Sequence, residues 1–252
     1  MENYIWFTVL VVPIGFALCF FLDALTLLAR LGGYLTKKNA SGSYVTQVIL
    51  VGSRFAVVLL FPAAAILVDT GFNSKSMFLT FSMGALLGSF LLLGLYFLRE
   101  QIALLFVKRI EIFLKQNNQT HHDKKLVVSG DRESICLEGK GEKLAEGEYW
   151  RSNKRLSFVI VLVTFINGAG LSLPMILSAS VDAYQLTVSH IGPLINVFAT
   201  LINILYVEAI LTRQLESTNS DSVWSLIKTF LLWRSLAMFL VSITYFLAYL
   251  YN

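Results

Sequence analysis

The amino-acid sequence predicts an all-α, polytopic membrane protein with six transmembrane helices and a cytoplasmic insert between the third and the fourth. Three observations predict this class. Of the 252 residues, 56% are hydrophobic and only 14% are charged, whereas about a quarter of the residues in a typical soluble domain are charged. The mean hydropathy of the chain is +0.68. Six apolar runs are long enough to cross a bilayer, which takes about 20 helical residues.

The six apolar runs form two groups of three, separated by a polar segment. Their residue ranges are 5–29, 45–68, 77–98, 156–180, 190–211 and 229–251. We therefore divide the chain into three parts. Residues 1–115 hold the first three helices and a helical extension, residues 116–155 form the insert, and residues 156–252 hold the last three helices.

The extension and the insert differ in composition. Residues 99–114 mix apolar and basic side chains at helical spacing, which is typical of a helix extension or an interfacial helix. The following segment is polar and rich in glycine, with two short strand-like pieces, and we expect a loosely ordered cytoplasmic insert. The pair His121 and His122 lies in it without an acidic or cysteine partner at ligand spacing, so we expect a polar loop rather than a metal site.

The distribution of basic residues predicts the orientation. The segments that follow the first, third and fifth spans carry 17 of the 20 lysines and arginines. The opposite side carries only Lys75, and Arg54 and Arg234 lie within spans. Because cytoplasmic segments are enriched in basic residues, we predict that these three segments are cytoplasmic and that both termini lie outside.

Four ionisable side chains fall within the predicted spans, toward their cytoplasmic side. They are Asp23, Arg54, Glu208 and Arg234, with Arg30 at the inner rim. A charge at the centre of a transmembrane helix costs about 2.5 to 3.5 kcal/mol on insertion scales, so the fold must satisfy each of them. Asp23 and Arg30 are seven residues apart and therefore share one face of their helix.

Polar and helix-bending residues complete the pattern. Asn167 in the fourth span and Asn203 in the fifth fall near mid-membrane, where an amide either bonds a neighbouring helix or contacts a ligand.

Prolines, which permit kinks, fall in the outer halves of four spans. These prolines are Pro13, Pro62, Pro174 and Pro193. The pattern predicts six helices around a cavity that is charged on its inner side and bendable on its outer side.

The same charges also fit a purely structural role. Asp23 with Arg54, and Glu208 with Arg234, would then be ion pairs that lock the bundle. Arg234 and Glu208 are also near enough to the membrane interface to snorkel. The sequence leaves the structural and the functional interpretation open.

The first two spans resemble the Amj family of bacterial lipid II flippases, an alternate to the MurJ flippase. Residues 21–33, FLDALTLLARLGG, are similar to the family motif of an aspartate, here Asp23, followed about two turns later by an arginine and a glycine. The second span resembles a family helix with a central Ser-Arg pair, here Ser53 and Arg54.

The fifth span resembles the same family more loosely. Its sequence INVFATLINILYVE follows an Asn-x-x-Ala-Thr pattern that ends in an acid, here Asn196, Ala199, Thr200 and Glu208. The resemblance covers the first two spans best, the last three loosely and the insert hardly at all.

The resemblance implies that the protein moves lipid-linked peptidoglycan precursor from the inner to the outer leaflet. The arginines would bind its pyrophosphate through charge-assisted hydrogen bonds, and Asp23 and Glu208 would hold these arginines when the site is empty. The expected substrate-binding residues are Asp23, Arg30, Arg54, Asn167, Asn203, Glu208 and Arg234.

The resemblance further implies an undecaprenyl-linked lipid substrate, the bacterial cytoplasmic membrane as location, and roles in peptidoglycan synthesis, cell wall biogenesis and cell shape. We expect no enzymatic activity, nucleic acid, cofactor or metal, because we find no phosphate-binding glycine loop, nucleophile elbow or metal motif. Two alternatives stay open: a small-solute or ion transporter, and a non-catalytic membrane assembly subunit. The energy source and the oligomeric state, including a homo-oligomer, also stay open.

Overall fold

Helices account for all the regular structure in the computed structural model of this protein, which describes residues 2–36, 38–120, 154–181, 188, 191–216 and 220–251. Six helical stretches in these ranges are long and apolar enough to cross a membrane. The predicted all-α membrane class and the six predicted spans are therefore confirmed.

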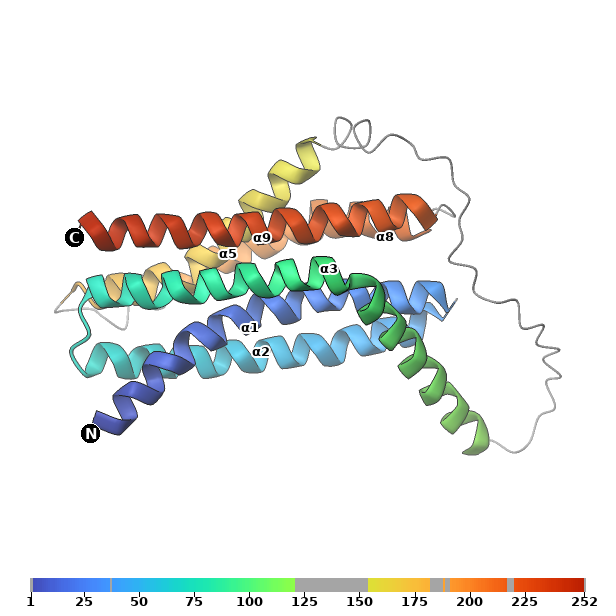
Figure 1. The fold of residues 1–252 in the computed structure, drawn as a ribbon, viewed down its shortest axis with the longest axis horizontal. Helices are drawn as coiled ribbons and strands as arrows, with labels where there is room; N and C mark the ends of the chain where they lie inside the picture. The colour runs from blue at the N-terminus through green and yellow to red at the C-terminus, as the bar shows by residue number, and fades with distance from the viewer. Residues whose placement is uncertain are drawn as a thin grey trace.

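The helices run alongside one another, and the two ends of the chain lie at the same end of the bundle (Figure 1). In chain order the elements are α1 (Glu2–Leu35), α2 (Asn39–Asp69), α3 (Ser74–Thr120), α5 (Lys154–Ser178), α7 (Ile191–Ile202), the π-helix η1 (Asn203–Glu208), α8 (Ala209–Glu216) and α9 (Ser220–Tyr251). That both ends lie outside the cell stays a prediction.

α1 and α2 form a close antiparallel hairpin because two glycines meet at its base. A Cβ atom added to Gly33 would lie 2.5 Å from the Cα atom of Gly42, so a side chain at this crossing would force the backbones apart. Farther along the hairpin, the Ser53 hydroxyl donates a hydrogen bond to the carbonyl oxygen of Cys19 at 3.4 Å. These contacts decide which side of α2 faces α1.

α3 and α9 are held together by two reciprocal serine pairs. The Ser82 and Ser242 hydroxyls each donate to the other residue's carbonyl oxygen at 2.9 Å. Ser89 and Ser235 repeat the arrangement at 3.0 and 2.9 Å. The pairs are seven residues apart on both helices, which is two helical turns. Small side chains with hydroxyls allow such close helix packing in membranes and satisfy their own polar atoms.

α3 is longer than a single membrane span requires. It continues without interruption to Thr120, so the predicted helical extension over 99–114 is confirmed, and the helix passes the predicted boundary at residue 115 by five residues. Figure 1 shows this extension bending away from the bundle. It starts against α1, where a Cβ atom added to Gly32 would lie 2.8 Å from the Cβ atom of Phe106. The strand-like pieces of the insert and the His121–His122 pair lie outside the described residues.

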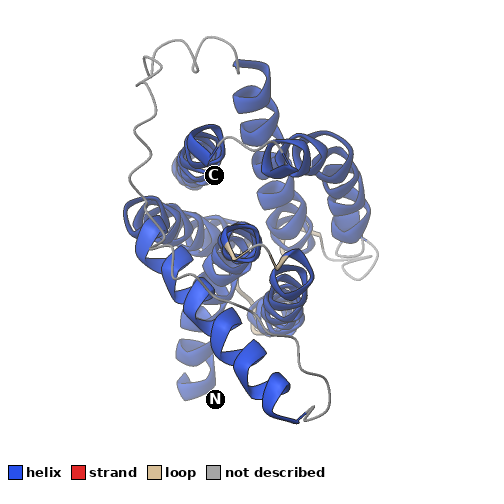
Figure 2. Ribbon diagram, turned by 90° about the vertical axis from the view of Figure 1, so that its right-hand side faces the viewer, coloured by secondary structure: helices blue, strands red, loops and turns tan. Residues whose placement is uncertain are grey.

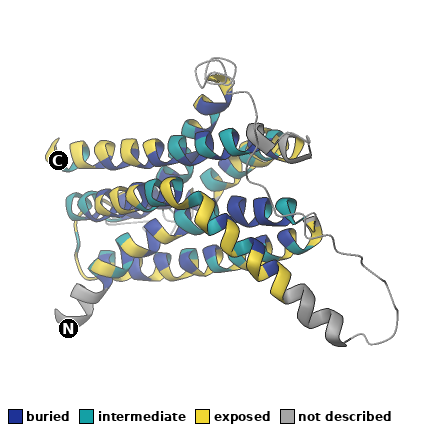
Figure 3. Ribbon diagram, turned by 45° about the vertical axis from the view of Figure 1, so that its right-hand side comes forward, coloured by how far each residue is buried: buried dark blue, intermediate teal, exposed yellow. Residues whose placement is uncertain are grey.

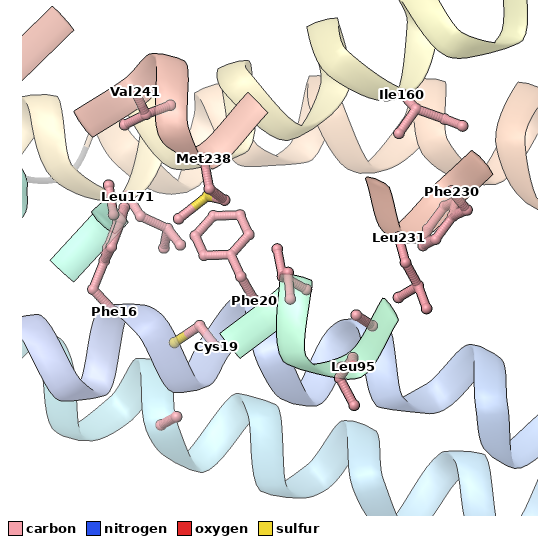
Figure 4. Close-up of a cluster of buried hydrophobic side chains, with 14 of the residues drawn as sticks. Phe16, Cys19, Phe20, Leu95, Ile160, Leu171, Phe230, Leu231, Met238 and Val241 are labelled. Atoms are coloured by element: carbon pink, nitrogen blue, oxygen red, sulfur yellow. The ribbon is translucent and has the colours of Figure 1, made fainter. Parts of the chain in front are cut away.

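Apolar side chains fill the interior between α1, α3, α5 and α9 (Figure 4). Burial follows the helix faces, with dark blue inner faces and yellow outer faces (Figure 3). The labelled core residues are Phe16, Cys19, Phe20, Leu95, Ile160, Leu171, Phe230, Leu231, Met238 and Val241. The end-on view of Figure 2 shows the helices gathered into one bundle. Because lipid is as apolar as the core, close packing rather than exclusion of water favours this arrangement.

Three of the predicted helix-bending prolines lie inside helices that continue through them: Pro13 in α1, Pro62 in α2 and Pro174 in α5. Pro13 also marks a close crossing, because a Cβ atom added to Gly84 of α3 would lie 2.9 Å from its Cα atom. The predicted bending of the outer walls stays a prediction.

Candidate functional site

The candidate site is organised by α1, which carries one acid and one base on the same face. Asp23 and Arg30 are separated by seven residues, so they are stacked two turns apart. Each side chain reaches a residue of opposite charge in the C-terminal half of the chain. α1 therefore joins the two halves of the protein by two ion pairs within its apolar span.

The first ion pair joins Asp23 to Arg234 of α9. The Arg234 Nη2 atom donates a hydrogen bond to the Asp23 Oδ2 atom at 3.2 Å. The two partners differ in exposure: the Arg234 side chain is 4% exposed and the Asp23 side chain 39%. The Arg234 guanidinium also lies 4.9 Å from the centre of the Phe230 ring, a distance at which the ring face attracts a cation.

The second ion pair joins Arg30 to Glu208, with the Arg30 Nη1 atom donating to the Glu208 Oε2 atom. Both side chains are about one third exposed, at 31% and 28%. Glu208 is the last residue of η1, the six-residue π-helix that interrupts the fifth span. A π-helical turn holds an extra residue and is often found at functional sites. Arg30 is therefore more accessible than Arg234, and its pair lies beside irregular helix geometry.

The pairing predicted for the structural interpretation is wrong. The sequence suggested Asp23 with Arg54 and Glu208 with Arg234, whereas the structure pairs Asp23 with Arg234 and Glu208 with Arg30. The observed pairing follows from the way the helices pack. α1 packs closely on α3, and α3 on α9, which brings Arg234 to Asp23. Arg30, which we placed at the rim, lies within reach of η1.

Arg54 does not join these pairs. It lies on the exposed side of α2, while its neighbour Ser53 points toward α1 and bonds Cys19. Within the described part of the chain, Arg54 has no ion pair and no hydrogen bond through its side chain. The sequence therefore located this charge correctly within a span but did not reveal the side of the helix on which it lies.

Asn167 and Asn203, the two predicted amides, are both partly buried, in α5 and at the start of η1. α7 packs on α5 where Gly170 makes room for the Asn196 side chain, since a Cβ atom on Gly170 would lie 2.6 Å from its Oδ1 atom. Asn203 follows Asn196 by seven residues, so it lies about 10 Å farther along the same helix, toward the end that holds Glu208.

One buried polar residue of α5 was not predicted as a site residue from the sequence. The Thr164 side chain of α5 is fully buried, and its hydroxyl has no hydrogen-bond partner among the described residues. Four residues later, a Cβ atom added to Gly168 would lie 3.8 Å from the Cζ atom of the Phe20 ring of α1. A threonine within an apolar run carries no signal in a single sequence.

This arrangement places two arginines and two carboxylates within an apolar bundle. Each pair is neutral, because one arginine meets one carboxylate. An anion that binds one arginine therefore has to displace a carboxylate, and phosphate groups compete well for this geometry because arginine binds carboxylate and phosphate alike in a bidentate manner.

Comparisons with known protein families, with curated proteins and with solved structures each find no match to this chain.

Proposed function

We propose that this protein is a membrane transporter that moves an anionic lipid, specifically the lipid-linked peptidoglycan precursor lipid II, from the inner to the outer leaflet of the bacterial cytoplasmic membrane. The substrate class follows from the resemblance of the first two spans to Amj-family flippases. The observation that carries the proposal is the pair of arginine–carboxylate contacts, Arg30–Glu208 and Arg234–Asp23, within a six-span apolar bundle.

The different exposure of the two pairs supports an order of binding. Arg30 and Glu208 are each about one third exposed, so a pyrophosphate meets Arg30 first and displaces Glu208. Arg234 is almost fully buried behind Asp23, so it becomes available only after the Asp23 carboxylate moves. Two arginines reached one after the other would carry the headgroup toward the bundle interior.

The π-helix supports the proposal because it gives Glu208 a way to move. η1 ends at Glu208, and conversion of a π-helical turn to an α-helical turn would rotate the residues that follow. Such a change would separate Glu208 from Arg30 without unfolding the span. Asn203 at the start of η1 and Asn167 of α5 would then supply hydrogen bonds to the polar headgroup. Arg54 has no assigned role in this scheme.

The test uses a bacterium whose essential lipid II flippase can be switched off. We expect the wild-type chain to restore growth, and Arg30→Gln to abolish this rescue while reaching the membrane at wild-type levels. Arg213→Gln, which changes an exposed arginine outside both pairs, is the matched control and should rescue fully.

Purified protein in vesicles containing a labelled lipid-linked precursor supplies the direct measurement. Wild-type protein should expose the label at the opposite leaflet, and Arg30→Gln should not. Failure of the wild-type chain in both assays would reject the transport proposal. Rescue by Arg30→Gln would reject the role of this pair.

The filled core favours a second candidate, a non-catalytic membrane assembly subunit in which the ion pairs only hold helices together. Apolar side chains occupy the space between α1, α3, α5 and α9 (Figure 4). Under this hypothesis, replacing both members of a pair by apolar residues preserves function, as it often does for structural pairs. Asp23→Leu combined with Arg234→Leu distinguishes the two, since a transporter needs the arginine itself.

A further inference from the structure

The exposed side of α2 carries a charge amid large apolar side chains. Arg54 lies there with Val51, Phe55 and Val58, whose spacing of three and four residues puts them along one helix face. The three apolar residues are 57%, 65% and 63% exposed. We call these four residues the Arg54 face.

The depth of Arg54 makes its exposure costly. It lies midway along α2, fifteen residues from Asn39 and fifteen from Asp69, which is about 22 Å from either end at 1.5 Å per residue. Half of the hydrocarbon layer is only about 15 Å thick. A charged side chain at this depth is costly, and no anion among the described residues pairs with Arg54 to offset that cost.

The packing of α2 keeps Arg54 on the outside. Ser53, Ala56 and Leu60 occupy the opposite side of the helix and are buried, and Ser53 bonds the backbone of α1. The Gly42 contact with Gly33 prevents rotation at the base of the hairpin. Turning Arg54 inward would break all of these contacts, so its outward position is a consequence of the fold.

We propose that the Arg54 face docks a transmembrane helix of a different protein that carries an aspartate or glutamate near mid-membrane. The positive charge of Arg54 selects a partner helix that carries an acid. A second copy that used the same face would bring two Arg54 side chains together, and like charges disfavour this. Asp23 and Glu208, the acids nearest to this depth, already bind arginines. This inference does not depend on the proposed transport function.

The helical spacing of the face fits one helix lying along α2. Val51, Phe55 and Val58 would pack against apolar or small side chains, and the acid would lie opposite Arg54. A phospholipid phosphate is a different source of anion, but it resides at the interface, so reaching Arg54 requires local thinning of the bilayer. The experiment below separates these cases.

The test uses the full chain in phosphatidylcholine vesicles with two synthetic single-span peptides. Both are leucine–alanine helices, one with a central glutamate and the other with a central glutamine. A photoreactive benzophenone side chain at position 55 reports contact. We expect a crosslinking yield about tenfold or more higher for the glutamate peptide, because polar pairs between membrane helices reach about this strength. The preference should vanish in Arg54→Leu and persist in part in Arg54→Lys.

A benzophenone at position 239 is the matched control, since Phe239 is exposed on α9 and no arginine is expected to draw the peptide there. Arg54→Leu removes no contact within the described fold, so its thermal stability should equal that of the wild type or exceed it. Equal yields for the two peptides, adducts only with lipid or with a second copy, or a preference that survives Arg54→Leu would overturn the proposal.

Discussion

Asp23 of α1 and Arg234 of α9 form an ion pair at 3.2 Å, although 211 positions separate them in the chain. The pair is unequal, because the arginine is buried and the carboxylate is partly exposed. This inequality determines what each substitution should do.

Removing the carboxylate should be more damaging than removing the whole pair. Asp23→Asn leaves a buried arginine without a counter-charge, and we expect it to lower the free energy of unfolding by about 3 kcal/mol. Asp23→Asn combined with Arg234→Met should stay within about 1 kcal/mol of the wild type, since no isolated charge remains. Unfolding in mixed micelles with increasing SDS measures both. Glu111→Gln, at an exposed position of α3 without an ion pair among the described residues, is the control and should have no effect.

Substitutions in the Arg30–Glu208 pair should destabilise the protein less than those in the Asp23–Arg234 pair. The two charges should also be exchangeable between the two positions. Both side chains are about one third exposed, so Glu208→Gln should cost only about 1 kcal/mol, in the range found for polar contacts in membrane proteins. Arg30→Glu with Glu208→Arg should recover most of the stability that either reversed residue loses alone. The same unfolding assay decides this, and a double variant less stable than both single variants would contradict it.

The base of the first hairpin should not tolerate a methyl group. Gly33→Ala puts a Cβ atom 2.5 Å from the Cα atom of Gly42, so α1 and α2 must separate, and we expect a loss of about 1 to 3 kcal/mol. Gly94→Ala is the matched control, because nothing lies within 4 Å of the added atom. It should be neutral or stabilising by up to about 1 kcal/mol through helix propensity. Similar melting temperatures for both variants would contradict the close crossing.

Each reciprocal serine pair should contribute to the free energy of unfolding as one unit. Ser89→Ala and Ser235→Ala should each cost about 1 kcal/mol, and the double variant should cost less than their sum, because both remove the same contact. Thr244→Ala is the control, since this exposed threonine bonds only the carbonyl oxygen of Leu240 in its own helix. Strict additivity in the double-mutant cycle would argue against the paired geometry.

Much of the fold could be predicted from the sequence because its signal is local. Apolar length identifies spans directly, and the structure confirms all six. The continuation of α3 was predictable for the same reason, since apolar and basic residues alternate at helical spacing after Leu98. The seven-residue spacing of Asp23 and Arg30 likewise guarantees that they share a face.

The sequence by itself determined the membrane class, the spans and the charges within them, because each depends on the local order of residues along a helix. The tertiary structure alone decided which charges meet. Arg234 reaches Asp23 because α3 brings α9 to α1 through its serine pairs, and Arg54 faces outward because Ser53 and Gly42 attach the other side of α2 to α1. Partner choice depends on how each helix is rotated about its axis. Packing between residues distant in the chain determines that rotation, and a single sequence does not record it.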